Sequence, residues 1–387
     1  MKSYYIEINP TDKQKQIINQ TIGICRYIYN EMIATNQLLY EMNQIGYSDI
    51  KFMSAYDFSK YVNHQLSKQE PWIKESSSKA VKQSMCNCEK AFKKFFKGKG
   101  GFPKFKKKAD KDVKMYLPKN HETDFFIKRH KIKIPILKWV LIKEKGYIPY
   151  NADITSCTIS KVAGKYYISI LTKETTQYSK LKEYTEGIGI DLGIKELAIT
   201  SDGECHKNIN KTSKVKKIEK RLKRQQRKLS KKLLKNKTKK KGEATKKNIN
   251  KSICLVQKTY AKLSRIRTEY IRTVVNSMVR IKPEYITIED LNVRGMMKNR
   301  HLSKAIQNQM FGYFKIFLIQ QCSKYNIEVR IVNRFYPSSK TCSNCGNIKK
   351  DLKLKDRIYR CECGLEIDRD YNAAINLKNC KEYKIAC

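Results

Sequence analysis

Apolar and polar residues recur along the chain with two different periods, and the first hundred residues show both. Residues 3–9 alternate as in a short β-strand, because every second side chain of a strand points to the same face. From Thr11 to about Phe96, apolar residues instead recur three and four positions apart, as on one face of a helix. The glycine-rich stretch 98–101 then ends this periodicity. The pattern predicts one strand followed by a block of helices.

Residues 111–177 return to β-type patterning in short runs separated by turn residues. The runs are VKMYL, KIKIPI, LKWVLI, CTISKV and KYYISIL. Runs of this kind predict a small antiparallel barrel or sheet. We expect the strand at 3–9 to join it, so that the helical block is an insertion within this β-unit.

A third unit begins near Tyr184, where strands and long helices alternate. GIGIDLGIKELAIT predicts two strands joined by a bend, with a hairpin turn at 201–203. Helices are expected over roughly 252–280 and 304–325, and again over DRDYNAAINLKN, with the strands EYITIEDL and IEVRIV between them. This alternation predicts an α/β unit, and the chain as a whole reads as a multidomain α+β protein.

Three acidic residues of this third unit are candidates for metal-assisted chemistry. Asp191 interrupts an apolar strand, where burying an unpaired carboxylate is costly, so we expect a cation near it. Glu289 shares one strand face with Tyr285 and Thr287, and Asp370 lies at the start of the last helix. Carboxylates that converge from separate strands suit two Mg²⁺ ions about 3.5–4 Å apart, the arrangement used for phosphodiester hydrolysis. Taken singly, the three acids also fit a turn residue, a solvated strand end and an N-cap.

Four of the 13 cysteines have the spacing of a zinc ribbon, namely Cys342, Cys345, Cys361 and Cys363. A glycine follows each pair, which suits a tight knuckle around a tetrahedral ion bound through thiolates. The second pair is C-x-C where C-x-x-C is usual. The odd cysteine total and the absence of an export signal argue against a disulfide framework, which leaves free buried thiols as the alternative to zinc.

The chain is strongly basic, with 82 Lys and Arg against 36 Asp and Glu and a formal charge of +46. Such a field favours a nucleic acid partner, whereas no apolar run approaches the roughly 18 residues that span a bilayer. The start MKSYYIEINP is too polar for a signal peptide. The densest basic segments are 211–251 and 92–108. In 92–108, phenylalanines alternate with lysines in a manner typical either of stacking on bases or of a solvated helix face. The candidate nucleic-acid-binding lysines are Lys93, Lys94, Lys97, Lys104, Lys106 and Lys107.

The order of several motifs resembles the TnpB family, which is encoded by insertion sequences. These motifs are GIGIDLGIKELAIT, ITIEDLNVRGM, FYPSSKTCSNCG and YRCECGLEIDRDYNAAINL. PTDKQKQIINQTIGICRYIYNE and AFKKFFKGKGGFPKFKKK extend the resemblance over essentially the whole chain. Members of this family, long labelled transposases, are understood as RNA-guided DNA endonucleases similar to the compact type V CRISPR effectors. Ile367 stands where many members carry histidine, a departure that removes no candidate acid.

The resemblance implies a division into four domains. Residues 1–10 and 111–183 correspond to a β-barrel wedge domain, and residues 11–110 to a helical recognition domain. Residues 184–340 and 364–387 correspond to a RuvC-like nuclease domain with an RNase H-type fold, and residues 341–363 to a zinc-ribbon insertion.

The resemblance also implies cofactors, partners and a mechanism. Asp191, Glu289 and Asp370 would bind Mg²⁺ in a two-metal site, and the four cysteines a structural Zn²⁺. A guide RNA encoded near the gene would pair with double-stranded DNA beside a short adjacent motif, in a bacterial or archaeal cytoplasm close to the nucleoid. The alternatives are a catalytically silent RNA-guided repressor, a strand-transfer transposase and a basic nucleic-acid-binding scaffold. The three acids disfavour the first, and the helical and β-rich N-terminal half disfavours the second.

Overall fold

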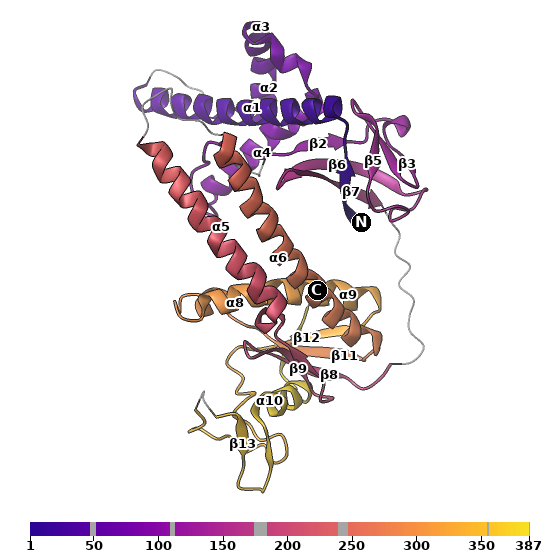
Figure 1. The fold of residues 1–387 in the computed structure, drawn as a ribbon, viewed down its shortest axis with the longest axis vertical. Helices are drawn as coiled ribbons and strands as arrows, with labels where there is room; N and C mark the ends of the chain where they lie inside the picture. Colours follow the sequence, from indigo (N-terminus) through magenta and orange to yellow (C-terminus); the bar gives the residue numbers. More distant parts are fainter. Residues whose placement is uncertain (47–51, 109–112, 174–183, 239–246, 354–355, 387) are drawn as a thin grey trace. The chain divides into compact units, whose positions relative to one another are not determined.

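The computed structural model describes residues 1–46, 52–108, 113–173, 184–238, 247–353 and 356–386 (Figure 1). The chain divides into two units, Met1–Thr175 and Thr176–Cys387. The finer division into four domains stays a prediction. Positions 111–112 and 174–177 of the predicted β-unit, and 239–246 of the basic run, lie outside the described residues. No helix in the described ranges is both long enough and apolar enough for a membrane crossing.

The first unit contains a seven-stranded antiparallel sheet in the order β2-β6-β7-β1-β5-β4-β3. Its strands are β1 Lys2–Asn9, β2 Met115–Pro118, β3 Phe126–Lys128, β4 Lys131–Ile134, β5 Lys138–Ile142, β6 Asp153–Val162 and β7 Lys165–Lys173. β1 lies between β5 and β7, which confirms that the first strand joins strands from beyond the helical block. Over the described residues β2 and β3 form two edges, so no closed barrel is seen.

The helical block lies between β1 and β2, as the periodicity predicts. Its elements are α1 Asp12–Gln44, α2 Ala55–Tyr61, η1 Val62–Leu66, α3 Ser67–Gln69, η2 Pro71–Glu75 and α4 Ser78–Phe96. The three longer helices begin where the sequence supplies caps, because the side chains of Thr11, Ser54 and Ser77 each accept a backbone N–H of the first turn. Ile18 and Cys25 of α1 pack into the core of the sheet, so α1 belongs to the same folded body.

The second unit contains a six-stranded mixed sheet in the order β10-β9-β8-β11-β12-β15. Its strands are β8 Ile188–Leu192, β9 Glu196–Thr200, β10 Cys205–Lys207, β11 Tyr285–Glu289, β12 Glu328–Val332 and β15 Tyr383–Ile385. β8, β9 and β10 run antiparallel, whereas β8, β11 and β12 are mutually parallel. The predicted α/β alternation is therefore confirmed.

The helices of this unit are η4 Ile209–Lys211, α5 Ser213–Lys237, α6 Lys247–Arg280, α7 Val293–Met296, α8 Ser303–Gln309, α9 Phe311–Lys324 and α10 Arg369–Lys378. Of these, α6 and α9 pack on one face of the sheet and α10 on the other. Ile190 and Ile288 pack with α6 and α9 on one face. Tyr285, two positions before Thr287 on the other face, has its hydroxyl 3.4 Å from the carbonyl oxygen of Lys378 in α10. The prediction that alternate residues of β11 share one face is thus confirmed, and α10 packs against that face.

The predicted single helix over 304–325 is wrong at one point. The chain breaks at Met310, whose φ of 55° is left-handed, so α8 and α9 are separate helices. The side chain of the preceding residue, Gln309, is buried and donates a hydrogen bond of 2.9 Å to the carbonyl oxygen of Gly193. A buried amide requires such a partner, which a continuous amphipathic pattern does not reveal.

Candidate active site and cysteine cluster

Asp191 and Glu289 lie next to each other at the same edge of the second sheet. β8 and β11 are parallel neighbours in which Ile190 is opposite Ile288, and the two acids are the residues that follow this pair. Both side chains are half-buried and both stand on the face that α10 covers. The carboxyl ends of parallel strands are the usual position of sites in open α/β sheets.

Helix α10 brings the third acid to the same region. Its N-cap is Asp368, whose Oδ1 accepts hydrogen bonds from the backbone N–H groups of Asp370 and Tyr371 at 2.9 and 3.1 Å. The alternative that Asp370 itself is the N-cap is therefore wrong, and its carboxylate is available for another role. Asp370 Oδ2 lies 3.9 Å from a nitrogen of Arg357.

The approach of α10 to β8 depends on Gly189. A Cβ atom placed there would lie 2.1 Å from the carbonyl oxygen of Ala374 and 2.4 Å from the backbone nitrogen of Lys378. Any side chain at this position would therefore displace the helix, because real Cβ atoms do not come so close to other heavy atoms. The glycine, two residues before Asp191 on the same face, lets the helix lie directly on the strand.

The three acids interact electrostatically. Burial, then the carboxylates of Asp370 and Glu289, raise the pKa of Asp191 to about 7 from an ordinary value of 3.8. The guanidinium of Arg369 opposes this rise, which confirms the expectation of a cation near Asp191. Burial, followed by the charge of Asp290, also raises the pKa of Glu289. The site thus concentrates negative charge that nearby cations only partly offset, and such a donor set suits hard divalent cations.

Asp290 has a different environment from its neighbour Glu289. Its two carboxylate oxygens lie 2.9 Å from Lys315 Nζ and 2.9 Å from a nitrogen of Arg334. The hydrogen bond from Lys315, the largest cause, lowers the pKa of Asp290 together with the contact from Arg334. Asp290 is already neutralised, which agrees with the choice of Glu289 as the site acid. The two cations lie 25 and 44 residues away in sequence, and no local pattern points to them.

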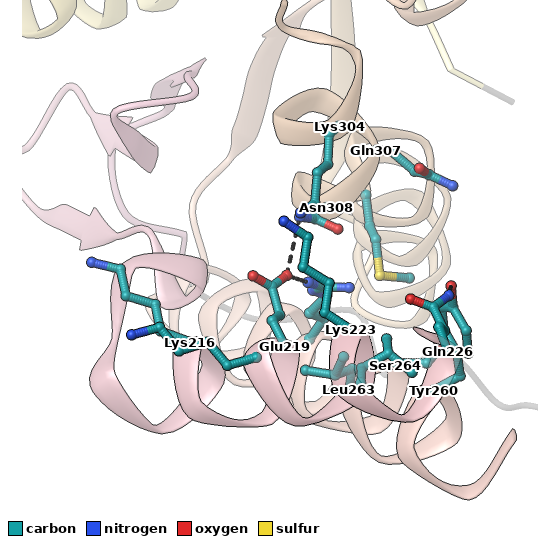
Figure 2. Close-up of a pocket in the computed structure, with 14 residues that line it drawn as sticks. Lys216, Glu219, Lys223, Gln226, Tyr260, Leu263, Ser264, Lys304, Gln307 and Asn308 are labelled. Atoms are coloured by element: carbon teal, nitrogen blue, oxygen red, sulfur yellow. Dashed lines mark hydrogen bonds and ion pairs between the residues drawn. The ribbon is translucent and has the colours of Figure 1, made fainter. Parts of the chain in front are cut away.

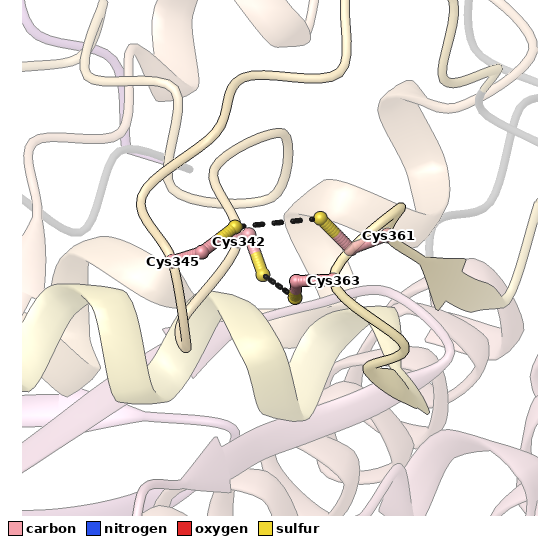
Figure 3. Close-up of side chains that lie close together, drawn as sticks. All are labelled: Cys342, Cys345, Cys361 and Cys363. Carbon is pink, nitrogen blue, oxygen red and sulfur yellow. Dashed lines mark hydrogen bonds between the residues drawn. The ribbon is translucent and has the colours of Figure 1, made fainter.

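The four cysteines converge, as Figure 3 shows. The Sγ atoms of Cys342 and Cys363 are 3.6 Å apart, and those of Cys345 and Cys361 are 3.5 Å apart. All four sulfurs lie within 4.8 Å of one another, and among the described residues no other group of three or more potential ligand atoms does so. Thiolates at about 2.3 Å from a tetrahedral zinc ion would be separated by about 3.8 Å. The sulfur separations at both knuckles, C-x-C included, therefore suit a zinc ion, whereas the carboxylates of the three acids do not form a cluster of this kind.

Backbone geometry and nearby donors prepare this cluster. Gly346 and Gly364 follow the two pairs with φ values of 77° and 88°, which favour glycine, and each closes a turn back to a cysteine carbonyl. A hydrogen bond from the backbone N–H of Leu365, together with one from the Asn344 amide, lowers the pKa of Cys363 to about 6. A thiol of this kind ionises readily for metal binding.

The cysteine loop is tied to the helix that carries Asp370. The fully buried amide of Asn372 in α10 accepts from the backbone N–H of Ser343 at 3.0 Å and donates to the carbonyl oxygen of Thr341 at 2.7 Å. Asn376, one turn later, donates to the same oxygen at 2.7 Å. The cluster and the acidic site therefore share one helix, a link that the sequence does not reveal.

The candidate lysines of the first unit lie at the end of α4 and in the segment after it. Lys93 forms an ion pair of 3.0 Å with Glu89. The side chain of Asn30 holds the backbone of Lys106, accepting from its N–H at 2.7 Å and donating to its carbonyl oxygen at 3.0 Å. Phe92 is buried against Phe52 and Phe102, so the expectation that this ring stacks on bases is wrong. The lysine assignments stay predictions.

Three protein-family models match the chain. The model described as "Probable transposase", named for OrfB of IS605, matches residues 169–300. A "Helix-turn-helix domain" model of the same OrfB group matches residues 1–44, where the structure shows β1 and the single long helix α1. The "Cas12f1-like, TNB domain" model matches residues 311–377, which include the four cysteines and Asp370.

Known proteins resemble the chain along nearly its whole length. A Streptomyces pristinaespiralis protein named "Putative RNA-guided DNA endonuclease" is 26% identical over 97% of this chain and 88% of that protein. The Escherichia coli K12 protein "Putative RNA-guided DNA endonuclease InsQ" is 25% identical over 100% of this chain and 94% of that protein. Among solved structures, a Cas12f1–sgRNA–target DNA complex matches with a TM-score of 0.60 and 16% identity, covering 97% of this chain and 84% of that chain, so the two share a fold. The chain belongs to the TnpB family of OrfB proteins, which is related to the type V CRISPR effectors.

Proposed function

We propose that this chain is an RNA-guided DNA endonuclease of a mobile element, with Asp191, Glu289 and Asp370 as its catalytic acids. The observation that carries the proposal is the convergence of the three acids. Two of them directly follow the paired residues Ile190 and Ile288 of adjacent parallel strands, and the third comes from a helix that lies on one of these strands. The names of the relatives, which describe RNA-guided DNA endonucleases, support the same activity.

The three carboxylates would hold Mg²⁺. The donor set fits, because burial, followed by the charges of Asp370 and Glu289, raises the pKa of Asp191, and nearby cations offset the negative charge of the three acids only in part. Two bound Mg²⁺ ions would supply an activated water and stabilise the leaving oxygen of the phosphodiester. The chain's own contribution is to fix the three acids on a rigid sheet and helix and to neutralise Asp290 separately through Lys315 and Arg334.

The four cysteines would hold a structural Zn²⁺. The sulfur separations of 3.5 and 3.6 Å support this. Through Asn372 the bound ion would stabilise the turn of α10 that presents Asp370. We assign the second unit to a RuvC-like nuclease domain of RNase H type that carries this zinc ribbon.

The first unit would hold a guide RNA and read a short motif beside the target. We assign its open sheet to the wedge domain and its helices to the recognition domain. RNA pairing would then supply sequence choice, while the protein grips the backbone and shape of the heteroduplex. The formal charge of +46 supports a large polyanionic partner such as a guide RNA.

The test is cleavage by the full-length chain expressed with its flanking genomic DNA. RNA that copurifies is sequenced, and a matching DNA target beside a randomised motif library is offered with Mg²⁺. We expect cleavage by the wild type, and none by Asp191→Ala, Glu289→Ala or Asp370→Ala, which should still bind RNA and target. Glu204→Ala, an exposed acid of the same unit, is the control and should cut normally.

The outcomes separate the alternatives. A chain that binds its matched target and never cuts is a repressor, and one that joins strands rather than hydrolysing them is a transposase. Cleavage that survives Asp191→Ala would overturn the assignment of the acids.

A further inference from the structure

A cavity of about 540 Å³ opens within the second unit between α5, α6 and α8, and none of the three acids lines it (Figure 2). Its volume falls within the range of small-molecule sites, about 300–1,000 Å³. Its floor is apolar, formed by the buried side chains of Leu222 and Leu263 together with Met310 at the break between α8 and α9. A cavity with an apolar floor can accept a flat, partly apolar group.

Hydrogen bonds between the helices hold the walls in place. Glu219 of α5 forms an ion pair of 2.7 Å with Arg267 of α6 and accepts a hydrogen bond of 3.4 Å from Asn308 of α8. Gln226 of α5 donates to the hydroxyl of Tyr260 in α6 at 2.7 Å. Glu219, the acidic residue that lines the cavity, is therefore already neutralised. The Tyr260 side chain is held at its hydroxyl end, although 50% of it remains exposed.

Four lysines surround the cavity: Lys216, Lys220, Lys223 and Lys304. All four side chains are exposed, and none has an acidic partner among the described residues. Lys216, Lys220 and Lys223 follow one another at spacings of four and three residues on one face of α5, and like charges at such spacings repel one another unless an anion lies between them. The lysines at the rim are thus complementary to phosphate groups. The apolar floor inside the rim is not complementary to phosphate and suits an apolar group.

An unpaired nucleotide combines the two required chemistries. Its base offers a flat surface for stacking on an exposed aromatic ring, and its phosphates are anionic. The polar side chains of Ser264, Gln307 and Asn308 at the wall can contact the edge of a base. A base in a duplex is already stacked and paired, so it cannot enter.

We propose that this cavity binds one unpaired base of a single-stranded nucleic acid, stacked on Tyr260, with the flanking phosphates held by Lys216, Lys220, Lys223 and Lys304. The proposal rests on the proposed function in one respect only, namely that the partner of the chain is a nucleic acid. It assigns a single-strand binding site that does not require the three acids or any metal ion.

The test is binding of short labelled strands to the full-length chain, stripped of copurified RNA and kept in a chelator so that no cleavage occurs. The probes are oligothymidine and oligouridine of about ten nucleotides, an abasic strand of equal length and a duplex. Base stacking predicts that Tyr260→Ala weakens single-strand binding at least about fivefold. Binding of the abasic strand and of the duplex should not change, and Tyr260→Phe, which keeps the ring, should restore most of the affinity. Tyr325→Ala removes a comparably exposed ring outside the cavity and should have no effect.

A matched pair of triple variants tests the rim. Lys216→Ala, Lys220→Ala and Lys223→Ala together remove three charges that line the cavity. Lys217→Ala, Arg221→Ala and Arg224→Ala remove three charges from the same turns of α5 that do not line it. We expect a larger loss of single-strand affinity from the first set, although the net charge falls equally.

The results distinguish this inference from the proposed function. If the wild type binds the strands but Tyr260→Ala binds them equally well, or loses the abasic strand to the same extent, the cavity proposal is wrong and the nuclease proposal stands. If the wild type binds no strand at all, the cavity proposal fails, whereas the nuclease proposal is decided by the separate cleavage test. Tighter binding of oligouridine or of oligothymidine identifies RNA or DNA as the source of the base.

Discussion

Gly189 in β8 packs so closely against Ala374 in α10 that a Cβ atom on the glycine would be 2.1 Å from the carbonyl oxygen of Ala374. The contact fixes the depth at which the helix rests on the strand. It therefore determines how close Asp370 comes to Asp191, which shares the strand and the face with Gly189.

Replacement of Gly189 by alanine should damage the candidate active site without changing any of the three acids. The added methyl group meets backbone atoms, so α10 must shift, and we expect a loss of about 1–3 kcal/mol in stability and at least a tenfold drop in cleavage rate. Thermal unfolding and cleavage of a matched target measure the two effects. Gly312→Ala is the control, since a Cβ there meets nothing within 4 Å. Wild-type melting and cleavage in Gly189→Ala would show that the contact is not limiting.

Asp191→Asn should stabilise the metal-free protein at neutral and alkaline pH. The folded pKa of Asp191, about 7, lies above its ordinary value of 3.8, so ionisation of this group opposes folding. The penalty is absent below pH 3.8, grows as the pH rises towards 7 and is complete above it. We expect Asn to raise the Tm in a chelator by a few degrees at pH 8 and by little at pH 4. An unchanged or lower Tm at pH 8 would contradict this.

Asp290→Asn should have the opposite effect. Hydrogen bonds from Lys315 and Arg334 lower the folded pKa of Asp290, so its charge supports folding above the ordinary pKa of 3.8. This support is lost as the pH falls through the lowered folded pKa. The variant should therefore melt below the wild type at pH 7, with a difference that narrows in acid. Melting curves of the two asparagine variants in one buffer series test both signs together.

How far the sequence predicts this site depends on the distance over which each relationship acts. Period-two patterning places Glu289 on one face with Tyr285, and an apolar strand makes Asp191 conspicuous. Both are local properties. The approach of α10 to Gly189 and the ion pairs of Asp290 join segments tens or hundreds of residues apart, and such contacts leave no periodic signal.

The same limit applies to the fold. Caps and periodicity predict the strands and the helical block, whereas the break at Met310 lies beside a hydrogen bond between the buried Gln309 and the distant Gly193, which no local pattern indicates. Closure of the first sheet likewise depends on how its edge strands pair rather than on the pattern within each strand. The described residues show an open sheet where a barrel was expected.

Loss of the cysteine cluster should impair cleavage as well as stability. Cys345→Ser with Cys363→Ser removes one ligand from each knuckle, and we expect zinc to fall from one ion per chain to none by elemental analysis. Since Asn372 ties the Cys342 loop to α10, the cleavage rate should also decrease at least tenfold. Cys205→Ser, an exposed cysteine outside the cluster, should retain zinc and activity. A chain that contains no zinc as purified would rule out the assignment of the metal.

Guide RNA affinity should fall steeply with salt, and the lysines after α4 should account for part of the slope. Each phosphate contact on a single strand contributes a slope of about −0.7 in log K against log salt, through counterion release. Replacing Lys94, Lys97 and Lys104 by alanine should therefore flatten the slope by about 2. The matched control removes Lys15, Lys119 and Lys143, which pair with Asp12, Asp153 and Glu7, and should leave the slope nearly unchanged despite the same loss of charge. Equal flattening by both sets would mean that the RNA responds to overall charge rather than to contacts in this segment.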